Sequence, residues 1–257
     1  MWHMDDPKES LTKAGRQLIE IERLLGAQFL PAEQNPLPEM TTPAEPQPPP
    51  SSASADQKAA ALARMDADEV KPCEKCELCH GRTNTVFGEG SADADLVFVG
   101  EGPGHEEDRT GRPFVGRAGE LLAKMIAAMG LTRDDVFICN VIKCRAPGNR
   151  SPAPQEIQAC WDYLVRQLQI IAPKVIVTLG NPATQTLLDT RTGITRMRGQ
   201  WQQLPLIGEG LAGIAVMPTF HPAYLLRNYS VDARGKVWAD LQQVMELLGL
   251  KPPQKNV

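Results

Sequence analysis

The sequence predicts an α/β fold, a three-layer sandwich in which helices flank a central four-stranded parallel sheet. Two observations support this fold class. Short apolar runs alternate with helix-length segments over residues 95–248, an order typical of βαβ units with right-handed crossovers. The first apolar run, residues 96–99, leads directly into a glycine turn at residues 100–104, as a buried strand does where it leaves a sheet.

Four apolar segments are the expected strands. They cover residues 95–100, 136–142, 174–179 and 214–217. Ligands of such sheets bind where the carboxyl ends of the strands meet. The residues at these ends therefore should converge; they are Gly100 and Glu101, Asn140, Gly180 and the segment 219–222.

Apolar residues at helical spacing predict the segments between and after the strands. The expected helices cover residues 119–129, 154–171, 181–188 and 232–248. The whole predicted globular domain covers residues 66–250, with a short tail at residues 251–257.

The chain before this domain has a different composition. Residues 1–30 contain one expected amphipathic helix at residues 10–26, with Ser10 as its cap. Residues 31–65 are rich in proline and alanine, too poor in apolar surface to offset ordering entropy, and predict a flexible linker. The helix and linker are interpreted as an arm that could dock a protein partner.

Charge and targeting signals limit the possible classes. The formal net charge is −4, yet residues 140–257 carry 13 Lys/Arg against 7 Asp/Glu, a net of +6 that permits a local phosphate-binding face. The first ten residues are polar and acidic rather than a secretory signal. No apolar run approaches the roughly 20 residues of a membrane helix, so we expect a cytoplasmic protein.

Six cysteines in a reducing compartment predict a metal centre rather than disulfides. Cys73 and Cys76 form one short knuckle, and Cys144 and Cys160 form a wide pair. Zinc ribbons usually carry two short knuckles, so this spacing favours an iron–sulfur cluster held by four thiolates. Cys79 repeats the short spacing and could compete with Cys76, whereas Cys139 lies in an apolar strand and reads as core.

The glycine turn is followed by acidic residues, which argues against a phosphate cradle. Carboxylates at Glu101 and Glu107 suit a bound water, or a cation that forms during a reaction. Asp108 is expected to cap the following helix.

Several short motifs, taken in order, give the chain a resemblance to a known family. They include Gly-Glu-Gly-Pro-Gly at 100–104, Gly-Arg-Pro-Phe-Val-Gly at 111–116, Asn-Val-Ile-Lys-Cys-Arg at 140–145 and His-Pro-Ala-Tyr-Leu-Leu-Arg-Asn at 221–228. Across residues 70–248 the chain resembles the family 4, iron–sulfur uracil-DNA glycosylases. The resemblance implies a uracil-DNA glycosylase-like fold and a monomeric DNA-repair enzyme that acts on uracil-containing DNA.

The resemblance also implies a cofactor. The four ligands of the family's 4Fe-4S cluster fall on Cys73, Cys76, Cys144 and Cys160. Uracil hydrolysis needs no electron transfer, so the expected role of the cluster is structural.

The implied reaction flips the base from the helix and hydrolyses its N-glycosidic bond, leaving an abasic site and free uracil. Phe114 would stack on the flipped base, and the Asn140 amide would pair with O4 and N3–H of uracil. His221 would donate to O2 as negative charge develops. Other members of the superfamily place Asp or Asn at the position of Gly102; here Glu101 and Glu107 would compensate.

Further residues are expected to contact DNA. Leu225, Leu226 and Arg227 would insert into the gap left by the flipped base. The candidates for phosphate contacts are Arg145, Arg150, Lys143, Arg196 and Arg198.

Two other functions stay open at this point. The first is a relative in the same superfamily that crosslinks to abasic sites through a reactive histidine in a basic loop. Residues 145–152, after Cys144, hold no histidine. The second is a non-catalytic, metal-containing nucleic-acid-binding module.

Overall fold

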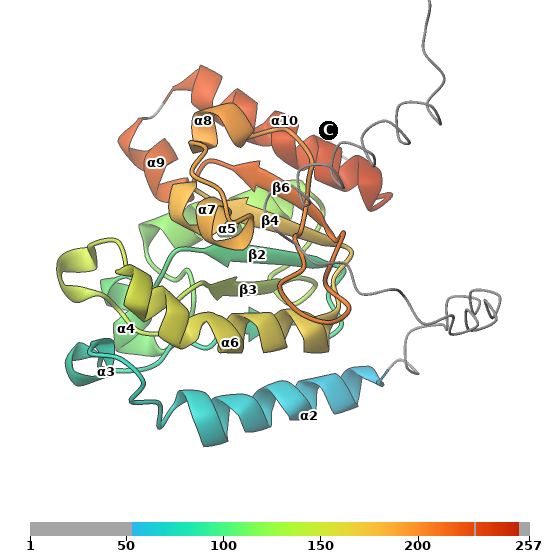
Figure 1. The fold of residues 1–257 in the computed structure, drawn as a ribbon. Coiled ribbons are helices and arrows are strands. Elements are labelled where there is room, and N and C mark those ends of the chain that lie inside the picture. The colour runs from blue at the N-terminus through green and yellow to red at the C-terminus, as the bar shows by residue number, and fades with distance from the viewer. Residues whose placement is uncertain (1–52, 229, 252–257) are drawn as a thin grey trace, which may run out of the picture. The chain divides into compact units, whose positions relative to one another are not determined.

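Four parallel strands form the centre of the sheet. The computed structural model describes residues 53–228 and 230–251. The sheet has the order β1-β3-β2-β4-β6-β5 (Figure 1). Its parallel strands are β3 (Phe137–Asn140), β2 (Leu96–Gly100), β4 (Val175–Leu179) and β6 (Ala215–Thr219).

The two edges of the sheet carry strands that the sequence did not predict. Strand β1 (Glu89–Gly90) pairs antiparallel with β3, and β5 (Gln202–Gln203) pairs antiparallel with β6. Each is two residues long, too short to show an alternating pattern. The predicted four-stranded parallel sheet is therefore confirmed, with two antiparallel edge strands added.

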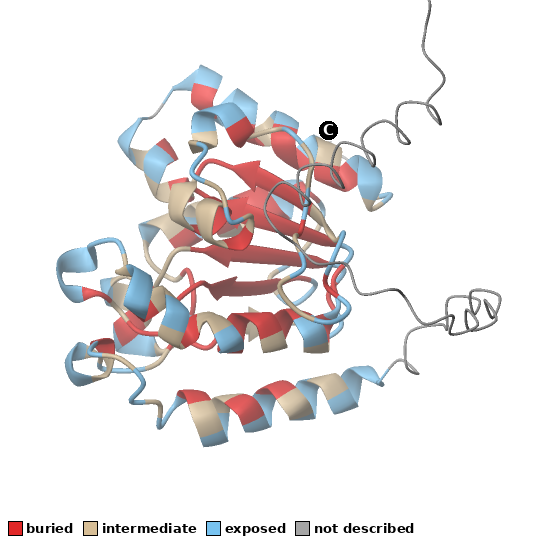
Figure 2. Ribbon diagram, in the orientation of Figure 1, coloured by how far each residue is buried: buried red, intermediate tan, exposed pale blue. Residues whose placement is uncertain are grey.

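Alternation along the strands builds two separate apolar layers, one on each face of the sheet. In β2, Leu96 and Phe98 pack with residues of α5 (Arg117–Ala128) and α10 (Val231–Leu247). Val97 and Val99, between them, pack with residues of α6 (Pro154–Ile171) and α7 (Asn181–Leu187). The four parallel strands are buried on both faces, as Figure 2 shows, which gives the predicted three-layer sandwich.

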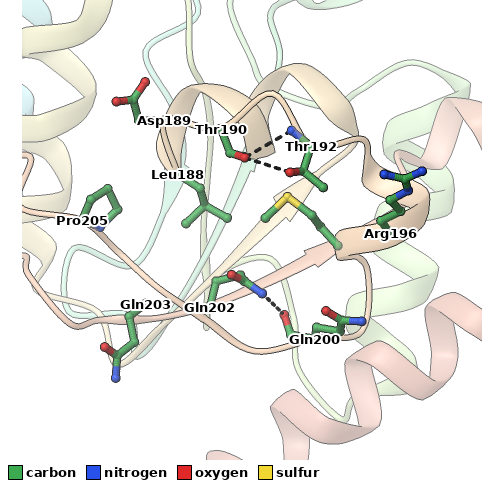
Figure 3. Close-up of a pocket in the computed structure, with 10 residues that line it drawn as sticks. Leu188, Asp189, Thr190, Thr192, Arg196, Gln200, Gln202, Gln203 and Pro205 are labelled. Atoms are coloured by element: carbon green, nitrogen blue, oxygen red, sulfur yellow. Dashed lines mark hydrogen bonds between the residues drawn. The ribbon is translucent and has the colours of Figure 1, made fainter.

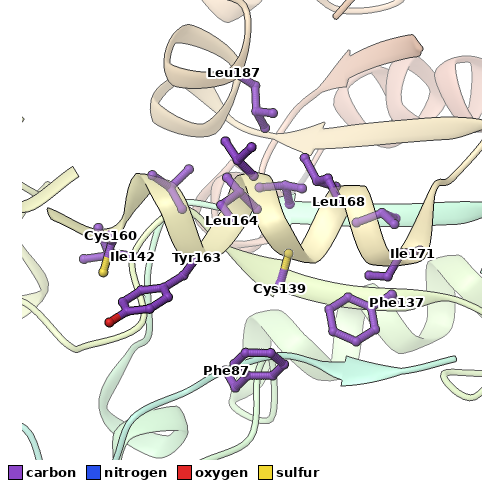
Figure 4. Close-up of a cluster of buried hydrophobic side chains, with 14 of the residues drawn as sticks. Phe87, Phe137, Cys139, Ile142, Cys160, Tyr163, Leu164, Leu168, Ile171 and Leu187 are labelled. Carbon is purple, nitrogen blue, oxygen red and sulfur yellow. The ribbon is translucent and has the colours of Figure 1, made fainter. Parts of the chain in front are cut away.

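Helix α6 supplies much of the layer shown in Figure 4. Its residues Leu164, Leu168 and Ile171 recur at helical spacing and are buried in the same apolar cluster as Phe137 and Cys139 of β3. The helix begins at Pro154 and ends at Ile171, and its C-cap residue Ala172 has a left-handed φ of +53°. Both bounds match the prediction.

Short helices complete the domain. They are α3 (Leu78–Gly81), α4 (His105–Thr110), α8 (Ile194–Met197), α9 (Pro222–Arg227) and a 3-10 turn, η2 (Pro147–Asn149).

The expectation of a linker up to residue 65 is wrong for its last part. Residues Ala55–Met65 form helix α2, which continues into a π-helical turn, η1 (Asp66–Val70). A reciprocal capping box between Ser54 and Gln57 starts the helix. Leu62 and Met65 are buried in the core layer with α6, so the folded domain begins earlier than its composition suggests.

The predicted helix at residues 10–26 and the linker up to residue 52 lie outside the described residues, as do residues 252–257 of the tail. Within the described part of the chain, no helix is both long and apolar enough to cross a membrane.

Replacing Leu62 by alanine should test whether α2 belongs to the domain. Leu62 is 5% exposed, and deleting a buried leucine side chain costs about 2–5 kcal/mol. We expect a clear fall in Tm measured by thermal denaturation. Leu206→Ala is the matched control because that leucine is 81% exposed. Equal melting temperatures for the two variants would contradict the packing of α2.

Candidate active site

The carboxyl edge of the sheet brings three predicted site residues together. Asn140 is the last residue of β3, and His221 follows the end of β6 by two positions. A Cβ atom on Gly100, at the end of β2, would collide with both the Asn140 amide oxygen and the Phe114 ring. The rings of Phe114 and His221 stack with centroids 5.6 Å apart. Asn140, Phe114 and His221 are therefore contiguous.

Asn140 carries an unsatisfied polar atom. The residue is 1% exposed, and its Oδ1 has no hydrogen-bond partner among the described residues. An unpaired buried polar group costs about 1–3 kcal/mol. Such a group persists where a ligand can satisfy it, and a carbonyl oxygen accepts a hydrogen bond from a ring N–H.

Phe114 is held in a left-handed backbone conformation. Its φ is +52°, which is unusual for a bulky residue. Arg133 donates from Nη1 to the Phe114 carbonyl at 3.1 Å and from Nη2 to the Pro113 carbonyl at 2.7 Å. A Cβ at Gly119 would collide with the Phe114 carbonyl, so that glycine lets α5 approach the loop. These contacts fix the ring beside Asn140.

His221 is a neutral hydrogen-bond donor. Its Nδ1 accepts a hydrogen bond from the Ala223 main-chain N–H at 3.0 Å, so the proton resides on Nε2. Burial and the positive charge of Arg227 lower the pKa of His221 from 6.5 to about 4, with Glu107 acting weakly in the opposite direction. The imidazole can therefore donate through Nε2 without being charged.

The two glutamates of the glycine turn differ in their contacts. Glu107 accepts from Gly104 N on one oxygen (3.1 Å), and from Val115 N (2.9 Å) and Gly116 N (3.0 Å) on the other. It thereby ties the glycine turn to the Phe114 loop. The Glu101 carboxylate makes no hydrogen bond or ion pair with another described residue, although its main-chain carbonyl accepts from Ile142 N at 3.2 Å; the residue is half-buried.

Asp108 is inside α4 rather than at its cap, which corrects the prediction. Its Oδ1 accepts from the main-chain N–H groups of Thr83 at 2.9 Å and Asn84 at 3.4 Å. The capping role in α4 falls instead to Glu107, whose carboxylate accepts from Gly104 N.

The space beside Gly102 is filled by another residue. A Cβ on Gly102 would lie 2.7 Å from Cγ1 and 2.9 Å from Cδ1 of Ile142. The missing side chain at this position therefore does not leave an empty volume.

Only two of the three residues predicted to insert into DNA are accessible to solvent. Leu225 is 2% exposed and belongs to the apolar layer with α5 and α10, so its assignment to DNA is wrong. Leu226 is half-buried and Arg227 is exposed. The neighbouring Tyr224 is 36% exposed, and its ring packs against Phe220 in a tilted arrangement with centroids 4.8 Å apart. It was not predicted, although it lies inside the same His-Pro motif.

Three of the basic residues proposed for phosphate contacts are buried or form ion pairs within the protein. Lys143 is 1% exposed, so its prediction is wrong. Arg198 forms an ion pair with the buried Asp240, and Arg150 forms a two-pronged pair with Glu156 at 2.7 and 2.9 Å. Such ion pairs depend on the tertiary fold, so the local sequence did not reveal them.

Arg145 and Arg196 stay candidates for phosphate contacts. Arg145 Nε donates to Asn149 Oδ1 at 2.7 Å. Arg196 is exposed and lines a pocket of about 520 Å³, shown in Figure 3. None of the residues that line this pocket belongs to the group around Asn140. The lining residues are Leu188, Asp189, Thr190, Thr192, Arg196, Met197, Gln200, Gln202, Gln203 and Pro205.

The four predicted ligand cysteines are electrostatic neighbours. Cys144 and Cys160 are buried, and Cys73 and Cys76 are half-buried. Burial raises the pKa of the Cys144 thiol to about 11, with Cys160 and Cys76 contributing in the same direction. Burial also raises the pKa of Cys160, again with contributions from Cys76 and Cys73. Arg82 Nη1 donates to Cys144 Sγ at 3.3 Å and to the Cys73 carbonyl at 2.7 Å.

This cysteine group is not arranged around a single ion. Among the described residues, no set of three or more His, Cys, Asp or Glu side chains could hold one metal ion. A cluster of several iron and sulfide ions is larger than one ion and separates its ligands more widely. Cys79 also lies near Cys76, so it stays an alternative ligand, while Cys139 is fully buried in β3, as predicted.

Comparison with known proteins agrees with this fold. Residues 87–242 match the family model of the uracil DNA glycosylase superfamily, and the chain belongs to that superfamily. The type-4 uracil-DNA glycosylase of Thermotoga maritima is 48% identical over 188 residues, which cover 73% of this chain and 95% of the relative. The corresponding enzyme of Archaeoglobus fulgidus is 46% identical over 189 residues, covering 72% and 92%. Within the superfamily, the chain belongs to the type-4 family.

The tautomer and low pKa of His221 can be tested by NMR. Because the folded environment favours the neutral ring, the His221 resonance should not titrate between about pH 5.5 and 8 and should shift only as the pH falls toward 4. As the pH falls below 6.5, the ordinary pKa of histidine, His221 becomes protonated in the unfolded chain but not in the folded protein. This difference favours unfolding, so His221 should lower the free energy of unfolding as the pH falls from 6.5 toward 4. The His221 resonance is the one that disappears from the spectrum of His221→Gln. A titration midpoint of that resonance near 6.5 would contradict the lowered pKa of His221.

Proposed function

We propose that this protein is a monofunctional uracil-DNA glycosylase. It hydrolyses the N-glycosidic bond of deoxyuridine in DNA, releases free uracil and leaves an abasic site for base excision repair. The observation that carries the proposal is the orphaned amide oxygen of Asn140, buried beside Phe114 and His221. Membership of the type-4 family supports the same substrate.

Asn140 would select uracil by its hydrogen-bond pattern. Its Oδ1 accepts from uracil N3–H and its Nδ2 donates to O4. Cytosine presents the reverse pattern and would leave both groups of a buried amide unpaired, at about 1–3 kcal/mol for each group. Phe114 supplies the stacking surface, a contact worth about 1–3 kcal/mol for a base on an aromatic ring.

His221 would stabilise the departing base. As the glycosidic bond breaks, its electron pair stays with uracil, and negative charge grows on O2. The neutral Nε2–H of His221 donates to that oxygen. A preorganised donor of this type contributes about 2.7–4 kcal/mol to catalysis in other enzymes.

Glu101 would position the water that attacks the sugar. Its carboxylate has no partner among the described residues, so it can accept from a water and oppose the oxocarbenium charge of the sugar. Glu107 is assigned a different part of the same reaction. It holds the Phe114 loop through two main-chain N–H groups and stays close enough to His221 to affect its pKa.

The DNA surface would lie around α9 and the basic loops. Leu226 and Tyr224 are the apolar candidates to fill the space of the flipped base, with Arg227 beside them. Arg145 and Arg196 are the remaining phosphate contacts. We further propose that the protein acts as a cytoplasmic monomer, with residues 1–30 available to dock a protein partner.

Cys73, Cys76, Cys144 and Cys160 would hold a 4Fe-4S cluster. Their mutual proximity and the Arg82 contact to Cys144 support this set, because a cationic donor stabilises thiolate sulfur. The cluster would tie residues 73–76 to the loop after β3 and supply no redox step. Abasic-site crosslinking is less well supported, since residues 145–152 contain no histidine.

The proposal is tested with a uracil-containing oligonucleotide. Incubation with the cluster-loaded protein followed by alkali should cut the strand at uracil. Asn140→Ala and His221→Ala should each lose most of this activity, while His80→Ala should keep it, because that side chain is 75% exposed. Absence of cutting by folded, cluster-loaded protein would refute the enzymatic function, and retained DNA binding would then favour a non-catalytic module.

Iron content distinguishes the two possible cysteine sets. Cys76→Ser should lose iron and visible absorbance in the purified protein, since a serine hydroxyl replaces a ligating thiolate. Cys79→Ser should keep both. The reverse result would move the ligand role from Cys76 to Cys79, and zinc in place of iron in the wild type would refute the cluster.

A further inference from the structure

We propose that Lys143, braced by Gln167, is a positioning residue for uracil recognition through the peptide bond that follows Asn140. The inference rests on the proposed function, and it replaces the phosphate contact that the sequence suggested for this lysine. Its support is a chain of buried hydrogen bonds that begins behind the glycosylase site.

The Lys143 ammonium group reaches the main chain of Asn140. Nζ donates to the Asn140 carbonyl at 2.8 Å and to Gln167 Oε1 at 2.6 Å. Gln167 in turn donates from Nε2 to the Phe87 carbonyl at 2.9 Å. All three side chains in this row, those of Asn140, Lys143 and Gln167, are at most 1% exposed.

Both ends of the peptide bond after Asn140 are therefore held. The Val141 N–H donates to the Gly100 carbonyl at 2.9 Å, while the Asn140 carbonyl accepts from Lys143. Fixing this peptide plane fixes the direction in which the Asn140 side chain leaves the backbone. An amide that must present a donor and an acceptor to the same base edge depends on that direction.

The burial of Lys143 is not explained by an ion pair with a carboxylate. Among the described residues, no carboxylate lies within ion-pair distance of its Nζ. Removing an ammonium group from water is unfavourable unless it is paired. An apolar side chain here would avoid that cost but could not donate to the Asn140 carbonyl and to Gln167, so the contacts of the lysine point to the geometry of the loop.

The same residue contacts the cysteine group. The Lys143 main chain lies close enough to the Cys160 thiol to lower its pKa, and the Lys143 carbonyl accepts from Val86 N at 2.8 Å. Figure 4 shows Cys160 beside Ile142 at one end of α6, the helix that also carries Gln167. Lys143 therefore connects the predicted cluster site with the base-reading amide.

The experiment compares wild type with Lys143→Met, Gln167→Met and Lys58→Met. Lys58 is the matched control: its side chain is 13% exposed, and its Nζ donates to the Ile171 carbonyl at 3.0 Å, far along α6 from the site. Four quantities are measured: Tm, affinity for abasic-site DNA, single-turnover uracil excision, and inhibition by free uracil.

Lys143→Met should lower the excision rate about 10- to 100-fold, the range expected for a misplaced recognition group, and weaken inhibition by free uracil by a similar factor. Affinity for abasic DNA should not change, because that ligand has no base for Asn140. Gln167→Met should show a smaller loss of the same kind, and it keeps the test valid if Lys143→Met does not fold. Lys58→Met should alter Tm alone.

A double-mutant cycle identifies the route of the effect. If Lys143 acts through Asn140, adding Lys143→Met to Asn140→Ala should cause no further loss of excision. Additive losses, or a Lys143→Met enzyme that recognises free uracil as wild type does, would overturn the inference. Lack of excision by the wild type would refute the proposed function itself, a separate result.

Discussion

The parallel register between β2 and β3 is the constraint on which the site depends. It pairs Gly100 with Asn140, so the last residue of each strand lies side by side. The absence of a side chain on Gly100 then leaves the space in which the Asn140 amide and the Phe114 ring meet. A shift of one residue would turn the Asn140 side chain to the other face of the sheet. Recognition of a base thus begins with the hydrogen bonding of two strands.

The Phe114 loop shows how the site maintains an unfavourable conformation. A bulky residue with φ of +52° costs on the order of 1–3 kcal/mol. Glu107 accepts from two N–H groups just after Phe114, and Arg133 donates to two carbonyls at and before it. Glu89 pairs with Arg133 at 3.2 Å and so anchors the arrangement to β1. The strained backbone at Phe114 is thus held by charged groups on either side of it, and the ring itself stacks on His221.

Local patterns predicted the elements that carry many apolar residues. Helix α6 was predicted to the residue because its proline start and apolar spacing are both local signals. Helix α2 was missed because its alanine-rich sequence has the composition of a linker, and its packing on the core depends on Leu62 and Met65. The site residues Asn140 and His221 came from family motifs, which encode positions that local propensity does not. The burial of Leu225 and Lys143 depends on distant parts of the chain, so sequence alone assigned both to DNA although their side chains lie in the core.

Buried polar groups are concentrated toward the carboxyl edge of the sheet. Asn140 and Thr219 end their strands, and Thr178 stands one residue before the end of β4, where its hydroxyl bonds Thr184 at 2.8 Å. Thr219 donates to Asp240 at 2.6 Å and precedes His221 by two residues.

Both sides of the base site are therefore supported by a buried hydrogen bond. Lys143 donates to the Asn140 carbonyl, and Asp240 accepts from Thr219, two residues before His221. Polar groups in a protein core are a local cost, and proteins retain them where geometry matters more than stability. Lys143 contacts the last residue of β3, and Asp240 of α10 contacts the last residue of β6, at opposite sides of the parallel sheet. These two supports would fix the separation between the amide that reads the base and the imidazole that would stabilise its departure. The distance across a flipped pyrimidine would thus be set by core residues that never touch it.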